Sequence, residues 1–352
     1  MLEQVDRTGV VAMKAMVVET PAPVTSRPLI MKEVADPQPG PGEVRVRVAA
    51  CGVCRTDLHV VEGELVHRLP IVPGHQVVGV VDMVGEQHDP GSVVGPRPAV
   101  GDRVGIPWLY RSCGVCRYCL QGEENLCEGA RFTGLDHDGG YAEYVVVPSD
   151  FAVPLPRTLD DVQVAPLLCA GIIGFRSLRV AGLRPGERLG LFGFGASAHI
   201  AVQIARYWGC EVFVFTRSEH HQGMALRLGA SWAGSAGQTP PAQVDRAVTF
   251  APAGFLIPEA LKVLRRGGVL AINAVHLDGI PAFPYELIYW EKTVRSVANA
   301  TREDALDFLE LAWKIPVKTE VQTFGLEETN EALIALKRGG IQGAAVLRVC
   351  SR

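Results

Sequence analysis

Four cysteines stand close together in the segment RSCGVCRYCLQGEENLC, at positions Cys113, Cys116, Cys119 and Cys127. Gaps of two residues allow one turn of backbone to direct two thiolates at a single point, and a more distant fourth sulfur can complete a tetrahedron. Four protein ligands leave no coordination position open, so this spacing predicts a structural zinc site that takes no direct part in chemistry. The alternative interpretation of the same four residues is a disulfide cluster.

Three further residues of metal-ligand type stand far apart along the chain. Cys54 lies in the segment CGVCRTDLH, His75 in PGHQ and Cys169 in LLCAG. Together they could form a Cys2His zinc site whose fourth position stays open for water or substrate. Their separation leaves the question open, because a histidine after Pro-Gly is commonly a turn residue and a cysteine before Ala-Gly commonly packs in a core. Cys51, three residues before Cys54, is expected to be a core cysteine.

These motifs occur in an order that resembles the zinc-dependent medium-chain alcohol dehydrogenases, and the resemblance covers nearly the whole chain. The matching segments are GVCRTDLH (52–59), PGHQVVG (73–79), GDRVG (101–105), the four-cysteine segment, GGYAEY (139–144) and LLCAG (167–171). The resemblance implies that Cys54, His75 and Cys169 hold a catalytic zinc ion in addition to the structural one. It also implies reversible hydride transfer between a primary or secondary alcohol and NAD(P), giving an aldehyde or ketone.

The resemblance assigns roles to the residues that follow the first ligand. Asp57 is implied to orient His75 from behind the metal, whereas a turn-capping aspartate would be the default interpretation without the motif. Thr56 is implied to take the proton of the alcohol, and His59 to pass this proton toward solvent. Arg55 matches a position that meets the cofactor pyrophosphate, and a solvated surface arginine is the alternative.

Two features near the expected metal centre bear on its reactivity and selectivity. Gln76 stands after Pro-Gly-His, where the family usually has glutamate. The amide removes a negative charge beside the metal, which should leave the metal more electrophilic. Trp108 and Leu109 lie in a stretch that faces the substrate in the family, and Trp108 there would narrow the pocket in favour of small alcohols. Packing of Trp108 inside the barrel is the alternative.

A dinucleotide-binding turn is indicated in the second half of the chain. The segment 188–192 is expected to be a strand, the segment from Ala198 onward a helix, and 211–215 a second strand. The turn between them reads G-x-G-x-x-A, in which Gly193 makes the tight turn and Gly195 lets the backbone approach a pyrophosphate. The residues expected to bind the cofactor phosphates at the helix N-terminus are Gly193, Gly195, Ala196, Ser197 and Ala198.

The residues after the second of these strands bear on the choice between NAD and NADP. An acidic residue normally binds the ribose 2′-hydroxyl of NAD there, but the chain reads Thr216-Arg217-Ser218 and has no acid at this point. Arg217 and Ser218 could receive a 2′-phosphate, which favours NADP, or Arg217 could stack near the adenine and leave NAD acceptable. The residues that flank the nicotinamide, by the resemblance, are Phe250, Ala274 and Val275.

The elements expected to hold these residues change in type along the chain. Up to about residue 160, short alternating strands separated by Gly and Pro predict a β-rich, barrel-like domain. Alternating strands and helices follow and predict a doubly wound parallel sheet. With the resemblance, this predicts a GroES-like barrel-type catalytic domain (1–170 and 302–352) and a Rossmann nucleotide-binding domain (171–301). Residues 1–11 are expected to be a loose extension.

Composition limits the partners that the chain is expected to have. A net charge of -4 and a pI near 6.2 give no reason to expect nucleic acid or an anionic membrane surface as a partner. The N-terminal segment lacks the features of a secretory signal, and nine cysteines with metal-ligand spacing suggest a reducing, cytoplasmic location. The resemblance favours a homodimer or homotetramer assembled through the nucleotide-binding domains, with a small-molecule alcohol or aldehyde as substrate.

Two other functions stay open at this point. The first is an NADPH-dependent aldehyde reductase that acts on larger, aromatic aldehydes. The second is a non-catalytic, zinc-stabilised nucleotide-binding protein, which would hold the structural ion but not the catalytic one.

Overall fold

The computed structural model describes residues 12–65, 68–86, 97–156, 159–315 and 317–350. The expected extension over residues 1–11 lies outside these residues. The chain divides into two compact units, each built from segments that are far apart in sequence. Unit 1 contains Met1–Cys169, Thr301–Leu306 and Thr319–Arg352, and unit 2 contains Ala170–Ala300 and Asp307–Lys318.

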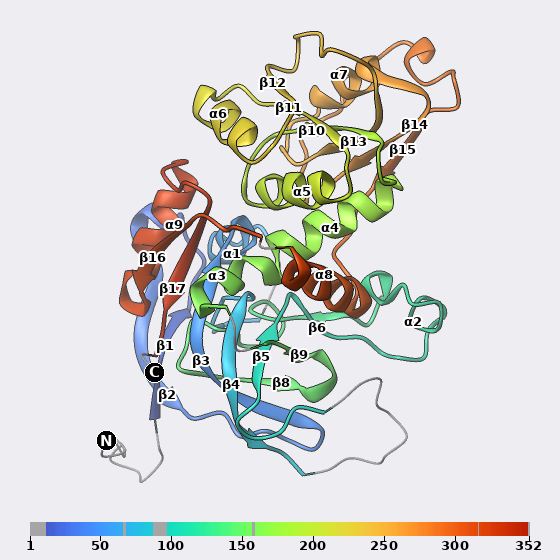
Figure 1. The fold of residues 1–352 in the computed structure, drawn as a ribbon. Helices are drawn as coiled ribbons and strands as arrows, with labels where there is room; N and C mark the ends of the chain where they lie inside the picture. Colours follow the sequence, from blue (N-terminus) through green and yellow to red (C-terminus); the bar gives the residue numbers. More distant parts are fainter. Residues whose placement is uncertain (1–11, 66–67, 87–96, 157–158, 316, 351–352) are drawn as a thin grey trace. The chain divides into compact units, whose positions relative to one another are not determined.

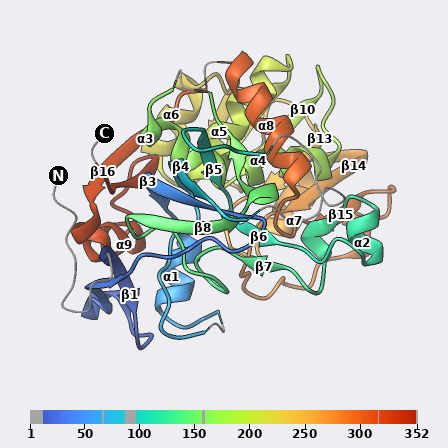
Figure 2. The ribbon, with the colours of Figure 1, turned by 90° about the horizontal axis from the view of Figure 1, so that it is seen from below.

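Unit 1 is built around a seven-stranded sheet, seen from two directions in Figures 1 and 2. Neighbouring strands follow the order β16-β17-β3-β4-β5-β9, and β8 pairs with β3. These strands are β3 (Glu43–Val53), β4 (Val77–Val84), β5 (Arg103–Ile106), β8 (Tyr144–Pro148), β9 (Val153–Pro154), β16 (Val321–Gly325) and β17 (Ala344–Arg348). Two small sheets accompany it, formed by β1 (Ala12–Val18) with β2 (Leu29–Ala35) and by β6 (Leu109–Arg111) with β7 (Arg131–Phe132).

The helices that lie wholly within unit 1 are short. They are α1 (Arg55–Val61), α2 (Arg117–Leu120), α3 (Asp161–Val164) and α9 (Thr329–Lys337). Single 3-10 turns are η1 (Val24–Ser26), η3 (Glu124–Leu126), η4 (Ser149–Phe151), η5 (Ala165–Leu168) and η7 (Leu326–Glu328). The β-rich character predicted for this part of the chain is therefore confirmed.

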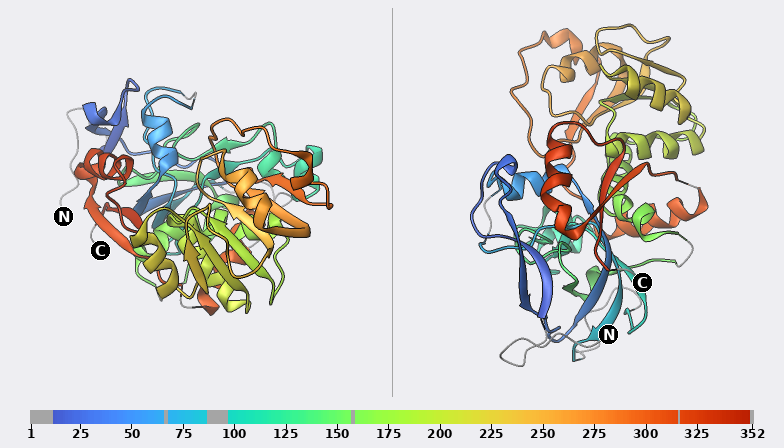
Figure 3. Two further views of the ribbon diagram at one scale, coloured as in Figure 1. Left: turned by 90° about the horizontal axis from the view of Figure 1, so that it is seen from above. Right: turned by 90° about the vertical axis from the view of Figure 1, so that its left-hand side faces the viewer.

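The central strand β3 organises the core of unit 1. Val44, Val46 and Val48 alternate along it and are fully buried, as β-branched residues on the inner face of a sheet are expected to be. Near its end β3 pairs with β17, where Val346 lies opposite Gly52. Segments from opposite ends of the chain therefore lie side by side immediately before Cys54, as Figure 3 shows for the blue and red strands.

Unit 2 holds a six-stranded sheet in which every paired strand is parallel. The strand order β12-β11-β10-β13-β14-β15 runs outward from β10 on one side and from β13 on the other, which is the doubly wound topology of dinucleotide-binding folds. The strands are β10 (Arg188–Phe192), β11 (Glu211–Phe215), β12 (Trp232–Gly234), β13 (Val244–Thr249), β14 (Leu264–Ile272) and β15 (Thr293–Ser296). The helices are α4 (Ala170–Ala181), α5 (Ala196–Tyr207), α6 (Glu219–Arg227) and α7 (Leu256–Val263), with a 3-10 turn η6 (Tyr285–Leu287).

Helices cover both faces of this sheet, with α5 and α7 on opposite sides (Figure 1). Phe213 and Phe215 of β11 pack in one core cluster with Ile257 and Leu261 of α7. Alternate residues of the same strand, such as Val212 and Val214, are also fully buried. A parallel strand that is buried on both faces reads as a continuous apolar run, and this explains the sequence EVFVF.

Two expected strands agree with the structure, whereas one expected domain boundary differs. The strands expected over 188–192 and 211–215 are confirmed as β10 and β11. The helix α8 covers Arg302–Lys314, and residues 265–268 form an irregular part of β14 in which the register with β13 shifts. The expected division placed all of 302–352 in the catalytic domain, whereas Asp307–Lys318 groups with unit 2, where Phe308 packs against Phe175.

Among the residues that the structure describes, one helical run meets the length and hydropathy criteria of a membrane span. It covers Asp161–Ala181, with 21 residues and a mean hydropathy of 1.5, but 72% of its apolar window is buried inside the protein. The run is also divided among α3, η5 and α4. These features are those of apolar core helices, and they are weak evidence for a membrane segment.

Candidate metal centres and dinucleotide site

The four cysteines between residues 113 and 127 come together at one point of unit 1, with their sulfur atoms all within 4.8 Å of one another. The Cys116 and Cys119 sulfurs are 3.6 Å apart, and those of Cys113 and Cys119 are 3.9 Å apart. Tetrahedral zinc with Zn–S bonds of about 2.3 Å requires sulfurs about 3.8 Å apart, so the four residues fit a zinc ion. All nine cysteines are free, so the structure gives no support to the disulfide interpretation.

Backbone amides prepare this four-cysteine cluster for a cation. The N–H of Cys116 donates to Cys113 Sγ at 3.3 Å, and the N–H of Cys113 donates to Cys127 Sγ at 3.4 Å. Backbone hydrogen bonds from Val115 and Cys116 lower the pKa of Cys113 to about 6, whereas burial raises that of Cys127 to about 11. A thiolate is thus available near neutral pH, and the thiolate is the form that binds metal.

A carboxylate ties the four-cysteine segment to the start of α8. Glu124, which is 7% exposed, accepts the backbone N–H of Arg302 at 2.6 Å and pairs with its guanidinium at 3.0 Å. Removing one partner of a buried pair leaves an uncompensated charge and is strongly destabilising. The loop that carries the four cysteines is therefore held to its own unit by a contact between residues 178 positions apart.

Cys54, His75 and Cys169 also converge within unit 1, although they come from three distant segments. Cys54 directly precedes α1, His75 lies shortly before β4, and Cys169 directly follows η5. Their ligand atoms lie within 4.8 Å of one another, with Cys54 Sγ 3.3 Å from His75 Nε2. Tetrahedral zinc requires about 3.5 Å between such atoms. Three ligands leave one position for a further group, so this set fits a zinc site of the open, catalytic type.

Asp57 holds two of these ligands in place. Its Oδ2 accepts the backbone N–H of Cys54 at 2.8 Å, and its Oδ1 lies 3.0 Å from His75 Nδ1. The first contact belongs to a capping box, since Cys54 is the N-cap of α1 and Asp57 is its third residue. The second contact assigns the proton to Nδ1 and leaves Nε2 as the ligand atom. Burial raises the pKa of Asp57, against the opposing effect of His75.

The charges in this cluster suit a divalent cation. The hydrogen bond from Cys169 lowers the pKa of Cys54 well below its ordinary value, and the same hydrogen bond, with burial, raises that of Cys169. Burial disfavours the charged form of His75, but the charges of Cys54 and Asp57 outweigh it and raise the pKa of His75. Without metal the cluster therefore retains protons on its ligand atoms, and metal binding would release them.

Gln76 presents an unpaired donor next to this centre. The residue is 2% exposed, and its Nε2 has no hydrogen-bond partner among the described residues. A Cβ atom at position 52 would lie 2.7 Å from Gln76 Oε1, so glycine at that position makes room for the amide. Buried polar groups are rarely left unpaired, and an orphaned amide here indicates that a further group enters the site.

Two aromatic rings lie beside the His75 ligand. The ring centroid of Trp108 is 4.8 Å from that of His75 in an edge-to-face arrangement, and Phe132 stacks on Trp108 at 5.0 Å. Leu109 is 4% exposed, packs into the core of unit 1 and lies opposite Phe132 in the pairing of β6 with β7. Phe132 was not predicted at this site, because it is brought to Trp108 by the pairing of β6 with β7.

The helix α1 displays the other residues expected at the site. Thr56 and His59 are partly buried and Arg55 is exposed. Thr56 and His59 are three positions apart and therefore share one face of the helix. His59 Nδ1 lies 2.5 Å from Glu64 Oε2, a contact that the sequence did not indicate.

A second unexpected neighbour is Tyr141, from the segment GGYAEY. The residue is fully buried, and burial followed by the charge of Asp57 raises the pKa of its hydroxyl well above the ordinary value. Its ring occupies the space that a side chain at Gly74 would need, since a Cβ there would lie 2.5 Å from it. Gly74 also has a φ of +99°, so the turn before His75 needs glycine for both reasons.

The glycine-rich turn of unit 2 has the form expected for a dinucleotide. Gly193 follows β10 with a φ of +88°, and a Cβ there would lie 2.8 Å from Ala251, so the fold itself requires this glycine. A Cβ at Gly195 would meet nothing within 4 Å, so an open space borders the backbone where α5 begins. Gly195 is the N-cap of α5 and provides no side-chain hydrogen bond, which leaves the N–H groups around Ala196, Ser197 and Ala198 for an anion.

The segment after β11 presents a basic residue beside this turn. Arg217 is exposed, while Ser218 caps α6 by accepting the N–H of His221 at 3.3 Å. The carbonyl of Thr216 accepts the Gln222 amide at 2.8 Å. His221 was not expected here, and its ring lies 6.4 Å from that of Phe194 in the glycine-rich turn. The fit of an anionic nucleotide is thus supported by charge as well as by space.

The remaining expected residues of this site lie at the same end of the sheet. Phe250 follows β13 directly and is partly buried, whereas Ala274 and Val275 lie just beyond β14. Val275 is 70% exposed. Ligands of doubly wound sheets bind outside the carboxyl ends of the strands, and all three positions meet this condition.

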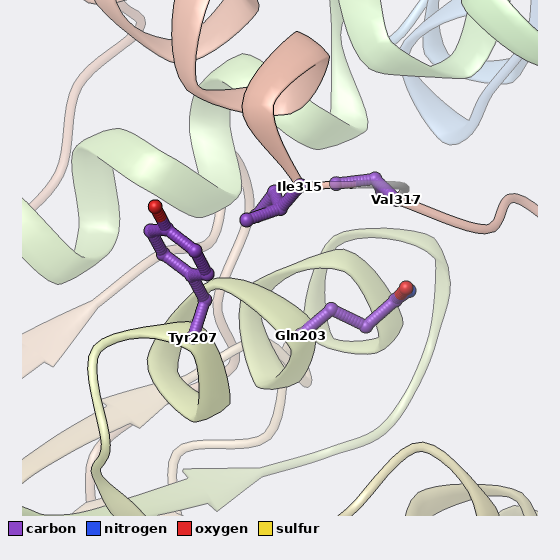
Figure 4. A pocket seen from close by; sticks show the side chains of 4 residues that line it. All are labelled: Gln203, Tyr207, Ile315 and Val317. Carbon is purple, nitrogen blue, oxygen red and sulfur yellow. The ribbon is translucent and has the colours of Figure 1, made fainter.

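A shallow hollow on unit 2 lies apart from these features. It is bordered by Gln203 and Tyr207 of α5 and by Ile315 and Val317 after α8 (Figure 4). The Gln203 amide donates to the carbonyls of His199 and Lys318, so its polar group is already engaged. The four lining residues include no ligand of the two cysteine-containing clusters.

Comparison with known proteins agrees with this geometry. Residues 40–157 match the alcohol dehydrogenase GroES-like domain, and residues 198–314 match the zinc-binding dehydrogenase domain. The two matches together define the chain as a dehydrogenase with a GroES-like and a Rossmann-type domain.

Individual relatives narrow the class. The chain is 48% identical to a probable alcohol dehydrogenase of Mycobacterium tuberculosis (strain CDC 1551 / Oshkosh), over 96% of this chain and 97% of that protein. It is 37% identical to an alcohol dehydrogenase of Geobacillus stearothermophilus, over 91% and 96%. The cobalt- and zinc-bound thermostable alcohol dehydrogenase of Pyrobaculum aerophilum superposes with a TM-score of 0.84 at 28% identity, covering 96% of this chain and 99% of that one. The chain belongs to the zinc-dependent medium-chain alcohol dehydrogenase family.

Proposed function

We propose that the chain oxidises primary or secondary alcohols, and reduces the corresponding aldehydes or ketones, by hydride exchange with NAD(P) at a site organised by Cys54, His75 and Cys169. The observation that carries this proposal is the convergence of three metal-ligand atoms within 4.8 Å, backed by the carboxylate of Asp57. Zinc held there would act as a Lewis acid that polarises the alcohol oxygen. Unit 1 would then be the catalytic domain and unit 2 the nucleotide-binding domain.

The chain's own residues would handle the proton. The Thr56 hydroxyl would accept it from the alcohol, and His59 would carry it onward to solvent, since an imidazole changes charge near neutral pH. Asp57 would keep His75 in one tautomer throughout. The Gln76 amide would add a neutral donor to the site where an anion would otherwise lie.

We also propose two zinc ions per chain, one in each cluster. Metal analysis together with steady-state turnover tests this proposal. About two zinc atoms per chain with turnover supports the enzyme, whereas one zinc and no turnover would leave a non-catalytic, zinc-stabilised nucleotide-binding protein.

The free thiols of both clusters fit a reducing, cytoplasmic location, which we propose for the protein.

We propose NADP rather than NAD as the cofactor, because Arg217 is exposed shortly after β11 and none of the three residues 216–218 is acidic. Replacing Arg217 by alanine is expected to weaken NADPH binding about 10- to 100-fold, since a charged hydrogen bond contributes about 1.5–3 kcal/mol. NADH binding should change by less than about twofold. Fluorescence titration with each cofactor measures both constants.

Arg227→Ala is the matched control for this titration, because Arg227 is an exposed arginine in the last turn of α6, the helix that follows Arg217. It should leave both affinities unchanged. Tighter binding of NADH than of NADPH by the unmodified chain, or equal losses for both cofactors in Arg217→Ala, would contradict the NADP assignment.

Small alcohols are the proposed substrates, because Trp108 and Phe132 stack beside His75. The rival assignment, an NADPH-dependent reductase of larger aromatic aldehydes, has some support from a likeness to a cinnamyl alcohol dehydrogenase of Sorghum bicolor, at 27% identity and a TM-score of 0.85. Rates with ethanol and with benzaldehyde, each with both cofactors, separate the two. Faster reduction of benzaldehyde than oxidation of any small alcohol would favour the rival.

Gln76→Glu is expected to move the pH profile of alcohol oxidation to higher pH by roughly one unit. An added negative charge beside the ligand cluster disfavours loss of the alcohol's proton, so turnover would rise only at higher pH. Gln121→Glu adds the same charge at an exposed position of unit 1 and should leave the profile in place. A profile that is the same in Gln76→Glu as in the unmodified chain would refute this effect.

We further propose that the chain forms a homodimer or homotetramer through unit 2. The strand β15 closes one end of the sheet order, and all four of its residues are exposed. Large apolar side chains gather in the same part of the chain, namely Tyr285, Tyr289, Trp290 and Val294, which are 41–67% exposed. Exposed apolar edges of this kind are typical of interfaces. Analytical ultracentrifugation distinguishes monomer, dimer and tetramer.

A further inference from the structure

The histidine proposed to carry the proton has a carboxylate partner. His59 Nδ1 lies 2.5 Å from Glu64 Oε2, which is short for a hydrogen bond. The His59 side chain is 17% exposed and that of Glu64 is 54% exposed. The His59 side of the pair, on α1, is therefore mostly buried, and the Glu64 side is exposed to solvent.

The backbone builds this contact through the way α1 ends. The helix ends at Val61, Glu62 caps it, and Gly63 then adopts a φ of +78°, a left-handed conformation that favours glycine. The chain turns back on itself, so the N–H of Glu64 donates to the His59 carbonyl at 2.9 Å. A Cβ at Gly63 would also lie 2.9 Å from Pro21, so the turn has little freedom to change.

The two glutamates at this helix end have different partners. Glu62 accepts the backbone N–H of Val24 at 2.8 Å and pairs with Lys337 at 2.6 Å. Its carboxylate thus joins α1 to η1 and α9. Glu64, two residues later, directs its carboxylate at the His59 ring instead. Glu62 contributes to the packing of unit 1, while Glu64 acts on a side chain of the proposed site.

We propose that Glu64 is the positioning residue of His59: it holds the proton on Nδ1, so that Nε2 is the atom that accepts the proton released by the substrate. A hydrogen bond at one ring nitrogen decides which tautomer the neutral ring adopts. When Nε2 takes up a proton, the Nε2–H bond forms while Nδ1–H stays intact, and the resulting imidazolium is stabilised by the adjacent carboxylate. In hydrolases, a carboxylate that is hydrogen-bonded to Nδ1 in the same way holds the catalytic imidazole in the correct tautomer and orientation. The inference rests on the proposed role of His59 in proton transfer.

The first test reads the tautomer directly and does not depend on turnover. Histidine labelled with nitrogen-15 in the zinc-loaded protein distinguishes Nδ1–H from Nε2–H at about pH 9, where an ordinary imidazole is neutral. The His59 signal is assigned by its loss in His59→Gln. We expect one Nδ1–H form in the unmodified chain and in Glu64→Gln, whose amide oxygen still accepts the hydrogen bond. Glu64→Ala should show exchange between both forms.

The second test separates positioning from folding. Glu64→Ala is expected to lower kcat about 10-fold with KM unchanged, a part of the roughly 10²- to 10⁴-fold that positioned proton transfer contributes. The kcat of Glu64→Gln should lie between those of Glu64→Ala and the unmodified chain, because the glutamine keeps His59 in one tautomer but lacks the negative charge. The matched control is Glu62→Gln, which removes the charge from the neighbouring glutamate and should leave both the tautomer and kcat in place.

The outcomes distinguish this inference from the function on which it rests. An unaltered tautomer in Glu64→Ala overturns the positioning role, whatever the kinetics. A tautomer that changes in Glu64→Ala while His59→Ala retains full turnover shows instead that the proton does not travel through His59, and this removes the role of the pair in catalysis.

Discussion

Cys54→Ser is expected to abolish alcohol oxidation while the chain stays folded. The polarisation of an oxygen by a metal ion contributes several kcal/mol to transition-state stabilisation, and each 1.4 kcal/mol is a factor of ten, so kcat should fall below about one thousandth. The zinc content should fall from two ions to one. The fold is expected to survive because Cys54 is the N-cap of α1, where serine is among the favoured residues.

A nearby cysteine provides the control. Cys51 lies three residues earlier, is fully buried in the core of unit 1 and is not among the clustered ligands. Cys51→Ala should keep two zinc ions and full turnover, at a cost of about 1 kcal/mol in the free energy of unfolding. The assigned ligand set would be contradicted if Cys51→Ala lost a zinc ion. It would also be contradicted if Cys54→Ser kept both zinc ions and its activity.

Cys116→Ser is expected to lower stability and to leave turnover largely unchanged, which is the reverse of the effects expected for Cys54→Ser. Loss of a structural metal belongs to the few changes that cost more than about 4 kcal/mol, which corresponds to roughly 10 °C in Tm for a domain of this size. The remaining zinc should lie in the cluster of Cys54, and the turnover of the folded fraction at low temperature should be close to normal. Differential scanning calorimetry with zinc analysis measures both effects.

Val115→Ser is the matched control for the structural cluster, because Val115 precedes Cys116 and is 78% exposed. It should change neither Tm nor zinc content. If Cys116→Ser removed activity without lowering Tm, the two clusters would have exchanged roles, and the division into a structural and a catalytic ion would be wrong.

Much of the fold was accessible from the sequence because its signals are local. The strand LGLF, the turn that follows it and the strand EVFVF carry their own periodicity and glycine spacing, and the structure places them at β10, Gly193–Ala198 and β11. The four-cysteine cluster is local as well, since its ligands span 15 residues. Such features can be predicted without knowing which segments pair with one another from distant parts of the chain.

Other features depend on the tertiary fold, and the sequence alone did not indicate them. Phe132 reaches Trp108 through strand pairing. Glu64 meets His59 because Gly63 reverses the chain. Cys54, His75 and Cys169 are separated by up to 115 positions, so their grouping rested on family resemblance until the structure placed their ligand atoms together.

The pairing of β17 with β3 has a consequence for how the protein is made on the ribosome. Val346 lies opposite Gly52, so the strand that leads into Cys54 lacks one neighbour until residues about 290 positions later have been synthesised. At 5–20 residues per second this interval lasts about 15 to 60 s. During that time unit 2 can fold, whereas the nascent β3 has an open edge and the Cys54 thiol lies next to an incomplete sheet. The cluster of Cys54, His75 and Cys169 is therefore expected to reach its final packing only after this C-terminal strand has been synthesised.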